Sequence, residues 1–307
     1  MVETSIIMAT YKEDLIYLKQ SIESILFQTY KDFEFIIILD NPENEEHKNL
    51  INNYLKQDNR IRFYINEKNL GLTNTLNRGL SLANGKYICR MDADDVSILN
   101  RIEIQKKYLE DNNYDLIGGI SKMIDENGCD IYSIKKVPMN FEKIKKAIKY
   151  NQVISHPTWF GKKEIFDKMN GYRNIPLCED YDFTLRALLE GYRISNVNSN
   201  VLNYRMTKNS ISRSNLFEQY LYSKYITAKY AKGQIANIDE AMEYVNKNNT
   251  SKKSKKYLLA NERFNDLLID VEEKHYLKFF IHGILLTFTS LNYLDKIYRL
   301  LRVSLIS

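Results

Sequence analysis

The chain has 307 residues, of which 44% are hydrophobic and 27% are charged. That mixture is typical of globular proteins, so it excludes a disordered or fibrous chain, and the length suffices for one large domain or two ordinary ones. The formal net charge of +5 is too small to indicate a nucleic-acid-binding protein by itself.

Strands and helices are predicted to alternate from the N-terminus to about residue 95. Short apolar runs, typical of strands buried on both faces, occupy residues 5–9, 33–39, 61–65 and 87–91. Helical patterns lie between them, over about residues 15–26, 45–57 and 72–83. We expect Asn84 and Gly85 to end the third helix with a left-handed backbone. The alternation predicts an α/β fold with a parallel sheet, helices on both faces and right-handed crossovers.

Beyond Asp95 the pattern is looser. The expected elements are a helix over 100–111, a strand near Leu116, a hairpin around 127–128, a helix over 141–150 and a helix from the acidic segment 178–182 to Gly191. From about Leu216 only helices are predicted, with a break at 248–250. We therefore expect a first domain over 1–215, with halves at about 1–95 and 96–215, and a C-terminal helical region over 216–307.

Cysteine content and hydropathy bear on the location of the protein. Cys89, Cys129 and Cys178 are few, odd in number and far apart, which predicts a reducing compartment and no zinc site. The N-terminus lacks a basic-then-apolar signal segment. The longest uncharged run, 279–294, is shorter than the roughly 20 apolar residues of a spanning helix. The expected location is cytoplasmic.

The first acidic cluster follows the fourth predicted strand. Asp92 and Asp94 alternate along an extended segment and so share a face, and Asp95 comes next. Clustered carboxylates repel one another unless a cation neutralises them, and Mg²⁺ favours one or two carboxylates together with phosphate oxygens. The alternative is a solvated acidic turn. Ligands bind at the carboxyl ends of strands in such sheets, where Ala9 and Asp40 are also expected, and this favours a binding site.

The second acidic cluster, Glu179-Asp180-Tyr181-Asp182, lies at a predicted helix N-terminus, where the helix dipole stabilises anions. Asp180 or Asp182 could serve as the N-cap. One carboxylate left ionised in a pocket could instead act as a general base. The residues alone leave both roles open.

Several long segments in a fixed order resemble the family-two inverting glycosyltransferases of bacterial surface-polysaccharide synthesis, which have the GT-A fold. The segments are SIIMATYKED, SIESILFQTYKDFEFIIILD, NLGLTNTLNRGLSLANGKYICRMDADD, SHPTWF and GYRNIPLCEDYDFTLRALLEGYRI. They cover most of residues 4–215. The resemblance implies a Rossmann-like, mostly parallel sheet in a GT-A domain, followed by a C-terminal helical extension.

The resemblance also implies roles for individual residues. Asp180 would be the catalytic base, and Asp94 would bind Mn²⁺ or Mg²⁺ on the donor diphosphate. The implied nucleotide-binding residues are Ala9, Thr10, Tyr11, Glu13, Asp40, Asn77, Asp92 and Ala93. The implied acceptor or phosphate contacts are Glu179, His156, Trp159 and Arg205. Two departures from the family pattern are Asn41-Pro42 after Asp40, and Met206-Thr207 where a further metal ligand often follows Tyr204-Arg205.

The implied activity is inverting transfer of a hexosyl or N-acetylhexosaminyl group from a UDP-sugar to a glycan or lipid-linked acceptor. The alternatives are a nucleotidyltransferase, although the loop after the first strand has no glycine, and a catalytically silent subunit that binds a partner glycosyltransferase. The protein would then work in the cytoplasm or on the inner face of the cell membrane, without nucleic acid.

Some residues have a plainer alternative role. Core packing is favoured over sugar stacking for Trp159, and His156 could be structural. Arg90 is expected to pair with the nearby aspartates, whereas Arg205 and Arg213 could hold phosphates or lie on the surface. The apolar and basic residues of the segment from 276 to 305 predict a membrane-facing helix, helices packed on the catalytic domain, or a homodimer interface.

Overall fold

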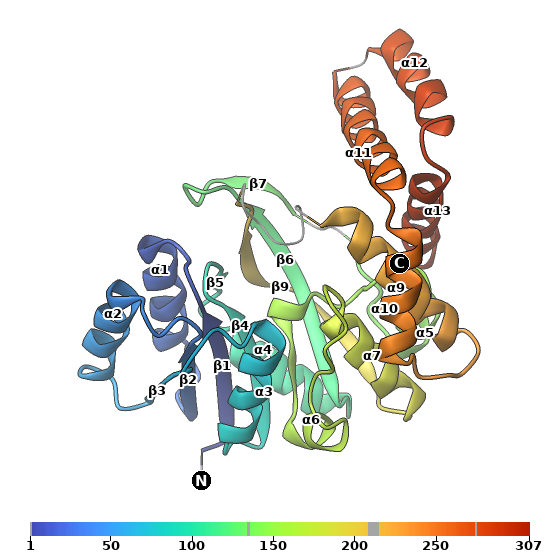
Figure 1. Ribbon diagram of the computed structural model, residues 1–307. Helices are drawn as coiled ribbons and strands as arrows, with labels where there is room; N and C mark the ends of the chain where they lie inside the picture. Colours follow the sequence, from blue (N-terminus) through green and yellow to red (C-terminus); the bar gives the residue numbers. More distant parts are fainter. Residues whose placement is uncertain (1, 134–135, 208–214, 274) are drawn as a thin grey trace.

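The computed structural model describes residues 2–133, 136–207, 215–273 and 275–307 (Figure 1). The first four strands are parallel neighbours, in the order β3-β2-β1-β4. They are β1 (Thr4–Thr10), β2 (Phe33–Leu39), β3 (Ile61–Ile65) and β4 (Tyr87–Asp92), and the connecting helices are α1 (Leu15–Leu26), α2 (Glu45–Leu55) and α3 (Leu72–Leu82). Every residue of β2 is buried, as its unbroken apolar sequence requires. The predicted alternation is confirmed.

The turn between α3 and β4 differs from the prediction. The positive backbone φ angles of the described chain occur at other residues, so Asn84 and Gly85 do not form a left-handed cap. A Cβ atom at Gly85 would lie 2.5 Å from the backbone nitrogen of Ser5. Glycine is therefore required here because the turn packs directly against β1.

The second half of the sheet is mixed. It contains β5 (Val96–Ser97), β6 (Leu116–Ile124), β7 (Asp130–Ser133), β8 (Phe160–Lys162) and β9 (Ile194–Arg205), and its helices are α4 (Arg101–Asp111), α5 (Phe141–Ala147), α6 (Lys163–Lys168) and α7 (Glu179–Leu189). β8 runs antiparallel to β4, and β9 runs parallel to β6. The predicted hairpin at 127–128 is confirmed as β6–β7. β8, β9 and α6 were not predicted, and the polar sequence of β9, ISNVNSNVLNYR, explains why it was missed.

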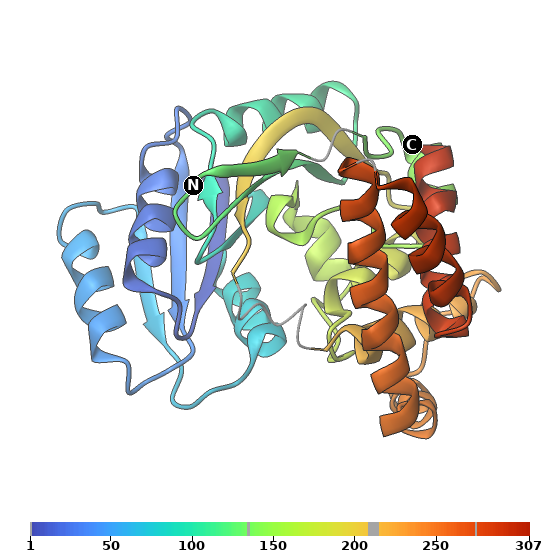
Figure 2. The same ribbon diagram turned by 90° about the horizontal axis from the view of Figure 1, so that it is seen from above.

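The sheet curls so that its far end returns to β4. β5 follows β4 directly in the chain, yet it pairs with β9 at the opposite end of the strand order, β3-β2-β1-β4-β8-β6-β9-β5. Figure 2 shows β9 arching over the second half of the sheet. The loop between β4 and β5, which carries the first acidic cluster, therefore lies between two parts of the sheet.

The C-terminal region is helical, as predicted, with the expected break at 248–250. Its helices are α9 (Leu216–Tyr230), α10 (Ile238–Asn248), α11 (Ser251–Glu272), α12 (Tyr276–Thr287) and α13 (Leu291–Ile306). α11 and α12 form a hairpin that projects from the body, and α13 returns to pack beside α5 (Figure 1). No helix among the described residues has both the length and the apolar content to cross a bilayer.

One hydrophobic core joins the sheet to these helices. It extends from Ile7, Ile36 and Ile38 on one face of the strands, through Trp159 and the α7 helix, to Tyr257 of α11 and further residues of α12 and α13. The opposite face of the same strands packs against α1, α2 and α4 in a second core. The C-terminal helices are thus positioned by the same packing that positions the sheet.

Candidate active site

The carboxyl ends of β1, β2 and β4 meet at one edge of the sheet, as predicted. Ala9 lies opposite Asp92 in the register of β1 and β4, and Thr10 lies opposite Leu39. The backbone N–H of Asp40 donates to the carbonyl of Thr10 over 2.8 Å. Three segments that are far apart in sequence therefore supply side chains to one rim.

Arg90 provides the positive charge at the centre of this rim. Its side chain is buried, and Nη2 lies 2.5 Å from Oδ1 of Asp92, which confirms the predicted pairing. Burial raises the pKa of both Asp94 and Asp180, and the charge of Arg90 offsets a part of that rise. Arg101, the other arginine beside the motif, binds backbone carbonyls instead, including those of Arg90 and Pro157.

Asp94 carries a carboxylate that forms no ion pair within the described residues. Burial is the main cause that raises its pKa to about 7, followed by the negative charges of Asp92 and Glu13. A divalent cation would reverse this effect, because it favours the ionised carboxylate. The described residues include no cluster of three metal-ligating side chains. The donor set therefore fits Mg²⁺ or Mn²⁺ held by one or two carboxylates together with oxygens of a ligand.

Asp95 and Arg205 hold this loop in place. The backbone N–H of Arg205 donates to Oδ1 of Asp95 at 2.8 Å, and its Nε donates to the carbonyl of Asp94 at 2.9 Å. The guanidinium also donates to Oε1 of Gln20 at 2.6 Å and lies over the ring of Tyr17. Arg205, the last residue of β9, thus links this strand to the acidic loop, a role that the sequence did not predict. A contact between Arg205 and phosphate stays a prediction. Arg213 lies outside the described residues.

The residues predicted to bind the nucleotide line the same rim. The Thr10 hydroxyl and the Tyr11 N–H both donate to Oε2 of Glu13, at 2.6 and 2.8 Å, which fixes the loop after β1. Ala93 is buried between the two aspartates. These contacts shape the loop, and a nucleotide contact by each of these residues stays a prediction.

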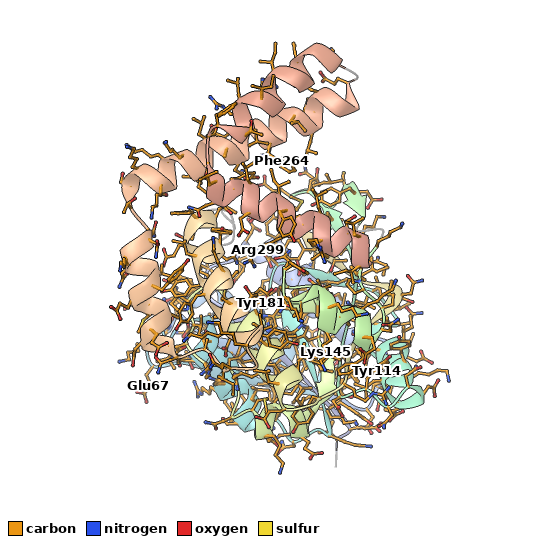
Figure 3. The ribbon with its side chains drawn as sticks, turned by 90° about the vertical axis from the view of Figure 1, so that its right-hand side faces the viewer. Glu67, Tyr114, Lys145, Tyr181, Phe264 and Arg299 are labelled. Atoms are coloured by element: carbon orange, nitrogen blue, oxygen red, sulfur yellow. The ribbon has the colours of Figure 1, made fainter. Side chains whose placement is uncertain are left out.

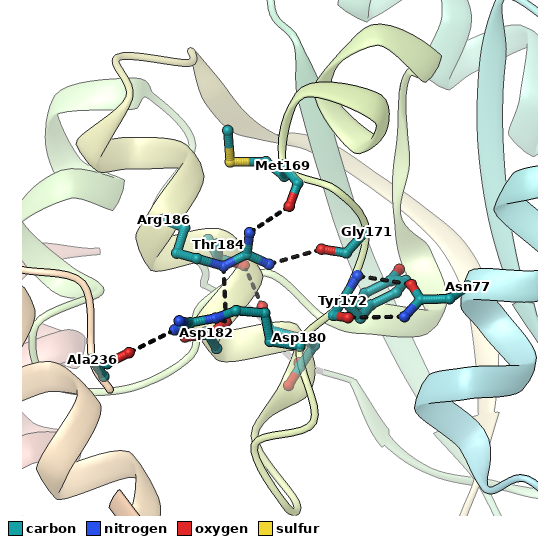
Figure 4. A network of polar contacts seen from close by, with 10 residues as sticks. Asn77, Met169, Gly171, Tyr172, Asp180, Asp182, Thr184, Arg186 and Ala236 are labelled. Atoms are coloured by element: carbon teal, nitrogen blue, oxygen red, sulfur yellow. Dashed lines mark hydrogen bonds and ion pairs between the residues drawn. The ribbon is translucent and has the colours of Figure 1, made fainter. Parts of the chain in front are cut away.

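Asp40 and Asn77 join neighbouring loops to the rim. The carboxylate of Asp40 accepts hydrogen bonds from the Asn66 amide and from the N–H groups of Leu70 and Gly71, at 2.6 to 2.9 Å. The amide of Asn77 bonds both backbone groups of Tyr172, which ties α3 to the loop before α7 (Figure 4). Both side chains are therefore structural ties, whatever they contact in a ligand.

The second acidic cluster opens α7, but neither aspartate caps the helix. Cys178 occupies the N-cap, and Asp182 accepts from Arg173 and Arg186, with ion-pair distances of 2.5 and 2.9 Å. Of the two roles that the sequence left open, capping is excluded, because Asp182 pairs with two arginines and Asp180 lies inside the first turn. Figure 4 shows this network, in which Arg186 also binds the carbonyls of the preceding loop.

Asp180 is therefore the aspartate of this cluster that has no cationic partner within ion-pair distance in the described chain. Nε2 of Gln152 donates to its Oδ2 at 3.2 Å. Burial raises the pKa of Asp180. Burial first, and the charge of Asp180 second, raise the pKa of Glu179 to about 7. Gln152 was missed by the sequence analysis, since nothing in its local sequence marks a loop glutamine as a partner of a distant carboxylate.

The two acidic clusters lie within electrostatic range of each other. The charge of Asp92 adds to the rise in pKa that burial and Asp180 cause at Glu179, and the charge of Arg90 offsets a part of the rise at both Asp94 and Glu179. Folding thus brings the carboxylates of both acidic clusters within electrostatic range of Arg90.

His156 and Trp159 both contact Tyr172, in the loop before α7. Trp159 is fully buried and packs against Tyr172 and Phe183, so packing is the role that the structure shows; no face of the ring is left for a sugar. Nε2 of His156 lies 2.9 Å from the hydroxyl of Tyr172. Burial, with a smaller effect of Arg90, lowers the pKa of His156 well below its ordinary value, so the neutral ring is favoured.

The chain matches a known protein family. Residues 5–169 match the family model described as glycosyl transferase family 2. An uncharacterized glycosyltransferase of Methanocaldococcus jannaschii is 40% identical over 203 residues, which cover 66% of this chain and 70% of that relative. The O-antigen biosynthesis glycosyltransferase WbnJ of Escherichia coli is 37% identical over 69% of this chain and 83% of its own length.

A third relative, from Escherichia coli, is named UDP-Gal:alpha-D-GlcNAc-diphosphoundecaprenol beta-1,3-galactosyltransferase; it is 30% identical over 68% of this chain and 76% of its own length. Among solved structures, TarS 1-349 of S. aureus in complex with UDP-GlcNAc has a TM-score of 0.61 at 18% identity, over 79% of this chain and 70% of TarS 1-349. The mannosyltransferase PcManGT of Pyrobaculum calidifontis, in complex with GDP-Man and Mn²⁺, has a TM-score of 0.59 at 16% identity, over 79% and 69%. The structural similarity confirms the predicted GT-A fold.

Proposed function

The chain belongs to glycosyl transferase family 2, and from this premise we propose that it moves a sugar from a UDP-sugar to a hydroxyl group of a glycan or lipid-linked glycan, with inversion at the anomeric carbon. The observation that carries the proposal is the placement of Asp94 and Asp180 around Arg90. The carboxylate of Asp94 is suited to bind a cation, and that of Asp180 is suited to accept a proton.

Asp180 is the proposed general base. As the acceptor oxygen attacks the anomeric carbon, its proton passes to the carboxylate of Asp180. The new glycosidic bond forms while the bond from the anomeric carbon to the diphosphate breaks, and UDP leaves with that electron pair. Attack from the face opposite the leaving group inverts the configuration in a single displacement. Gln152 orients the carboxylate by its hydrogen bond to Oδ2.

Asp94 is the proposed ligand for Mn²⁺ or Mg²⁺. The bound cation would neutralise charge on the leaving diphosphate. The chain's own contribution is the position of the carboxylate. Arg205 fixes the backbone of Asp94, and Arg90 neutralises Asp92 so that two unpaired carboxylates do not face the donor.

The relatives support the substrate classes. One relative's name specifies a UDP-galactose donor and a lipid-linked acceptor, and the solved structure of TarS 1-349 holds UDP-GlcNAc. We extend the UDP-sugar donor and the glycan or lipid-linked glycan acceptor to this chain on that basis.

UDP release, measured with and without acceptors over a panel of UDP-sugars and Mn²⁺, tests the proposal. For Asp180→Asn we expect donor binding to persist and transfer to fall at least about a hundredfold, since general base catalysis typically contributes that much or more. For Asp94→Ala we expect calorimetric titration to show loss of metal-dependent donor binding. Asp266→Asn, at an exposed position on α11, is the matched control. Full transfer by Asp180→Asn contradicts the assignment of the base.

We further propose that the α11–α12 hairpin contacts an anionic membrane at the inner face of the cell. Ile284 of α12 and Phe288 at its C-cap expose 58% and 86% of their surface, and Leu291, which begins α13 next to the hairpin, exposes 83%. The first turns of α11 carry four exposed lysines: Lys252, Lys253, Lys255 and Lys256. Apolar side chains together with basic ones are typical of helices that lie on anionic lipid. A homodimer through 216–307 is the alternative, and it is distinguished by the oligomeric state in solution.

A further inference from the structure

A cavity of about 240 Å³ lies beside the carboxylate of Asp180. Its walls come from the start of α7 and from α9, α11 and α13, so the C-terminal helices complete it. Figure 3 shows Arg299 of α13 above Tyr181 of α7, and both residues line the cavity. If Asp180 deprotonates the acceptor hydroxyl, this cavity is where the adjoining part of the acceptor would lie.

The wall formed by α13 presents an uncompensated positive charge. Lys296 lines the cavity and, within the described residues, forms no ion pair. Its ammonium lies 5.1 Å from the ring centroid of Tyr293 and 5.7 Å from that of Tyr257. Burial lowers the pKa of Lys296, which shows that its charged form lacks the solvation or partner it would have elsewhere.

Arg299, the neighbouring cation in the lining, differs from Lys296 because it forms an ion pair. Nε of Arg299 lies 2.9 Å from Oδ2 of Asp295, and the same carboxylate oxygen accepts from the hydroxyl of Tyr220 at 2.7 Å. Arg299 is therefore neutralised by Asp295. Lys296 follows Asp295 in sequence but forms no ion pair with a carboxylate in the described structure.

A second polar group of the cavity lining, Tyr257 on α11, also lacks a partner. Tyr257 is fully buried, it lines the cavity, and its hydroxyl makes no hydrogen bond in the described structure. A buried hydroxyl without a partner is unfavourable, and Tyr257 belongs to the lining of the cavity, where a ligand would supply that partner. Tyr257 and Lys296 together offer a hydroxyl donor and an ammonium, the kinds of group that bind phosphate oxygens.

We propose that the cavity between α7 and the C-terminal helices binds the acceptor, and that Lys296, with Tyr257, selects acceptors whose sugar adjoins a phosphate or diphosphate group. Asp180, the proposed base, lines this cavity from α7, and the unpaired Lys296 lines it from α13. The hydroxyl to be deprotonated is thereby directed to Asp180, and the anionic group to Lys296. This inference rests on the proposed function, because it takes Asp180 as the base.

Kinetics with two matched acceptors test this specificity. The same sugar is offered as a neutral alkyl glycoside and as an alkyl diphosphate glycoside, both with short, soluble alkyl chains. We expect Lys296→Gln to raise the KM for the diphosphate acceptor at least tenfold more than the KM for the neutral one, with Lys296→Arg restoring most of the difference. Lys56→Gln, at an exposed lysine that ends α2 and does not line the cavity, should change neither value. Equal KM changes for the two acceptors would overturn the proposal.

A binding experiment separates this inference from the proposed activity. Inorganic pyrophosphate is titrated calorimetrically into the whole chain in EDTA, which removes the cation that would hold it at Asp94. We expect wild type and Asp94→Ala to bind it and Lys296→Gln to bind at least tenfold more weakly. Absence of binding by wild type, or equal binding by Lys296→Gln, refutes the inference even if UDP release confirms the transferase. Binding that depends on Lys296 in a chain that transfers no sugar would refute the proposed function alone.

Discussion

Asp94→Asn tests the electrostatics of the first acidic cluster without reference to catalysis. The substitution keeps the shape of the side chain and removes a half-buried charge that faces Asp92 and Glu13. We expect the metal-free variant to be more stable than the wild-type chain at pH 8, although it has lost a ligand for the cation. Mn²⁺ should reverse this order, because only the wild-type carboxylate binds the ion.

The magnitude follows from the pKa of Asp94, which the fold raises from its ordinary value of 3.8 to about 7. A group whose pKa is raised on folding contributes stability that is present below its unfolded pKa and is lost as the pH rises through its folded pKa. At pH 8 the wild-type chain has lost all of this contribution, at most about 4 kcal/mol, since one pKa unit corresponds to about 1.4 kcal/mol. At pH 5 it has lost less than half of that amount.

Urea denaturation in EDTA at pH 5 and pH 8 measures the effect. The difference in unfolding free energy between Asp94→Asn and wild type should grow with pH, and Asp266→Asn at an exposed position should show no such growth. A variant that is less stable than wild type at pH 8, or a stability difference that does not change with pH, would refute the inference that the unpaired charge of Asp94 destabilises the folded chain.

Three further predictions concern the base, the packing and the C-terminal surface. Because the pKa of Asp180 is raised, transfer at saturating metal and donor should decline as the pH falls, with a midpoint above the ordinary range of aspartate near 4; a rate that stays constant down to pH 4.5 would contradict this. Gly85→Ala should destabilise the fold by roughly 1–3 kcal/mol, since its Cβ would meet the backbone of β1, whereas Gly283→Ala in α12 should stabilise it by about 0.5–1 kcal/mol; chemical denaturation compares the two. The chain should sediment with vesicles that contain anionic lipid, less so at high salt, and the double variant Phe288→Ser/Leu291→Ser should remain in the supernatant; binding that is unaffected by the double variant, or a salt-resistant dimer in ultracentrifugation, would favour the homodimer instead.

The rim of the sheet could be predicted because it depends on local patterns. Apolar runs such as 33–39 and helical spacing along α1 are visible in any short window, and parallel strands necessarily bring their carboxyl ends together. Asp40 and Asp92 could therefore be placed at one edge before the fold was known. β9 could not, because its residues alternate poorly and its partners, β6 and β5, were themselves weak or unpredicted signals.

The partners of the site residues were harder to predict for a physical reason. Arg205 and Gln152 act through loops that only the curl of the sheet and the packing of α7 bring into range. Asp180 and Asp182 are equivalent by sequence, and they differ only because Arg173 and Arg186 fold against one of them. Side-chain environments that depend on several distant elements leave no local pattern.

The charges that the fold leaves uncompensated impose an order on substrate binding. On the proposed function, an ionised Asp94 and a donor diphosphate would repel each other, so at neutral pH the cation would have to bind before the donor or together with it. Protonation of Asp94 as the pH falls through about 7 would relieve the repulsion. The raised pKa of Asp180 works in the opposite sense for catalysis, because acidity that lessens the need for the cation also favours protonation of the proposed base. A chain with these two aspartates should depend on a divalent cation most strongly at the pH where its base is active.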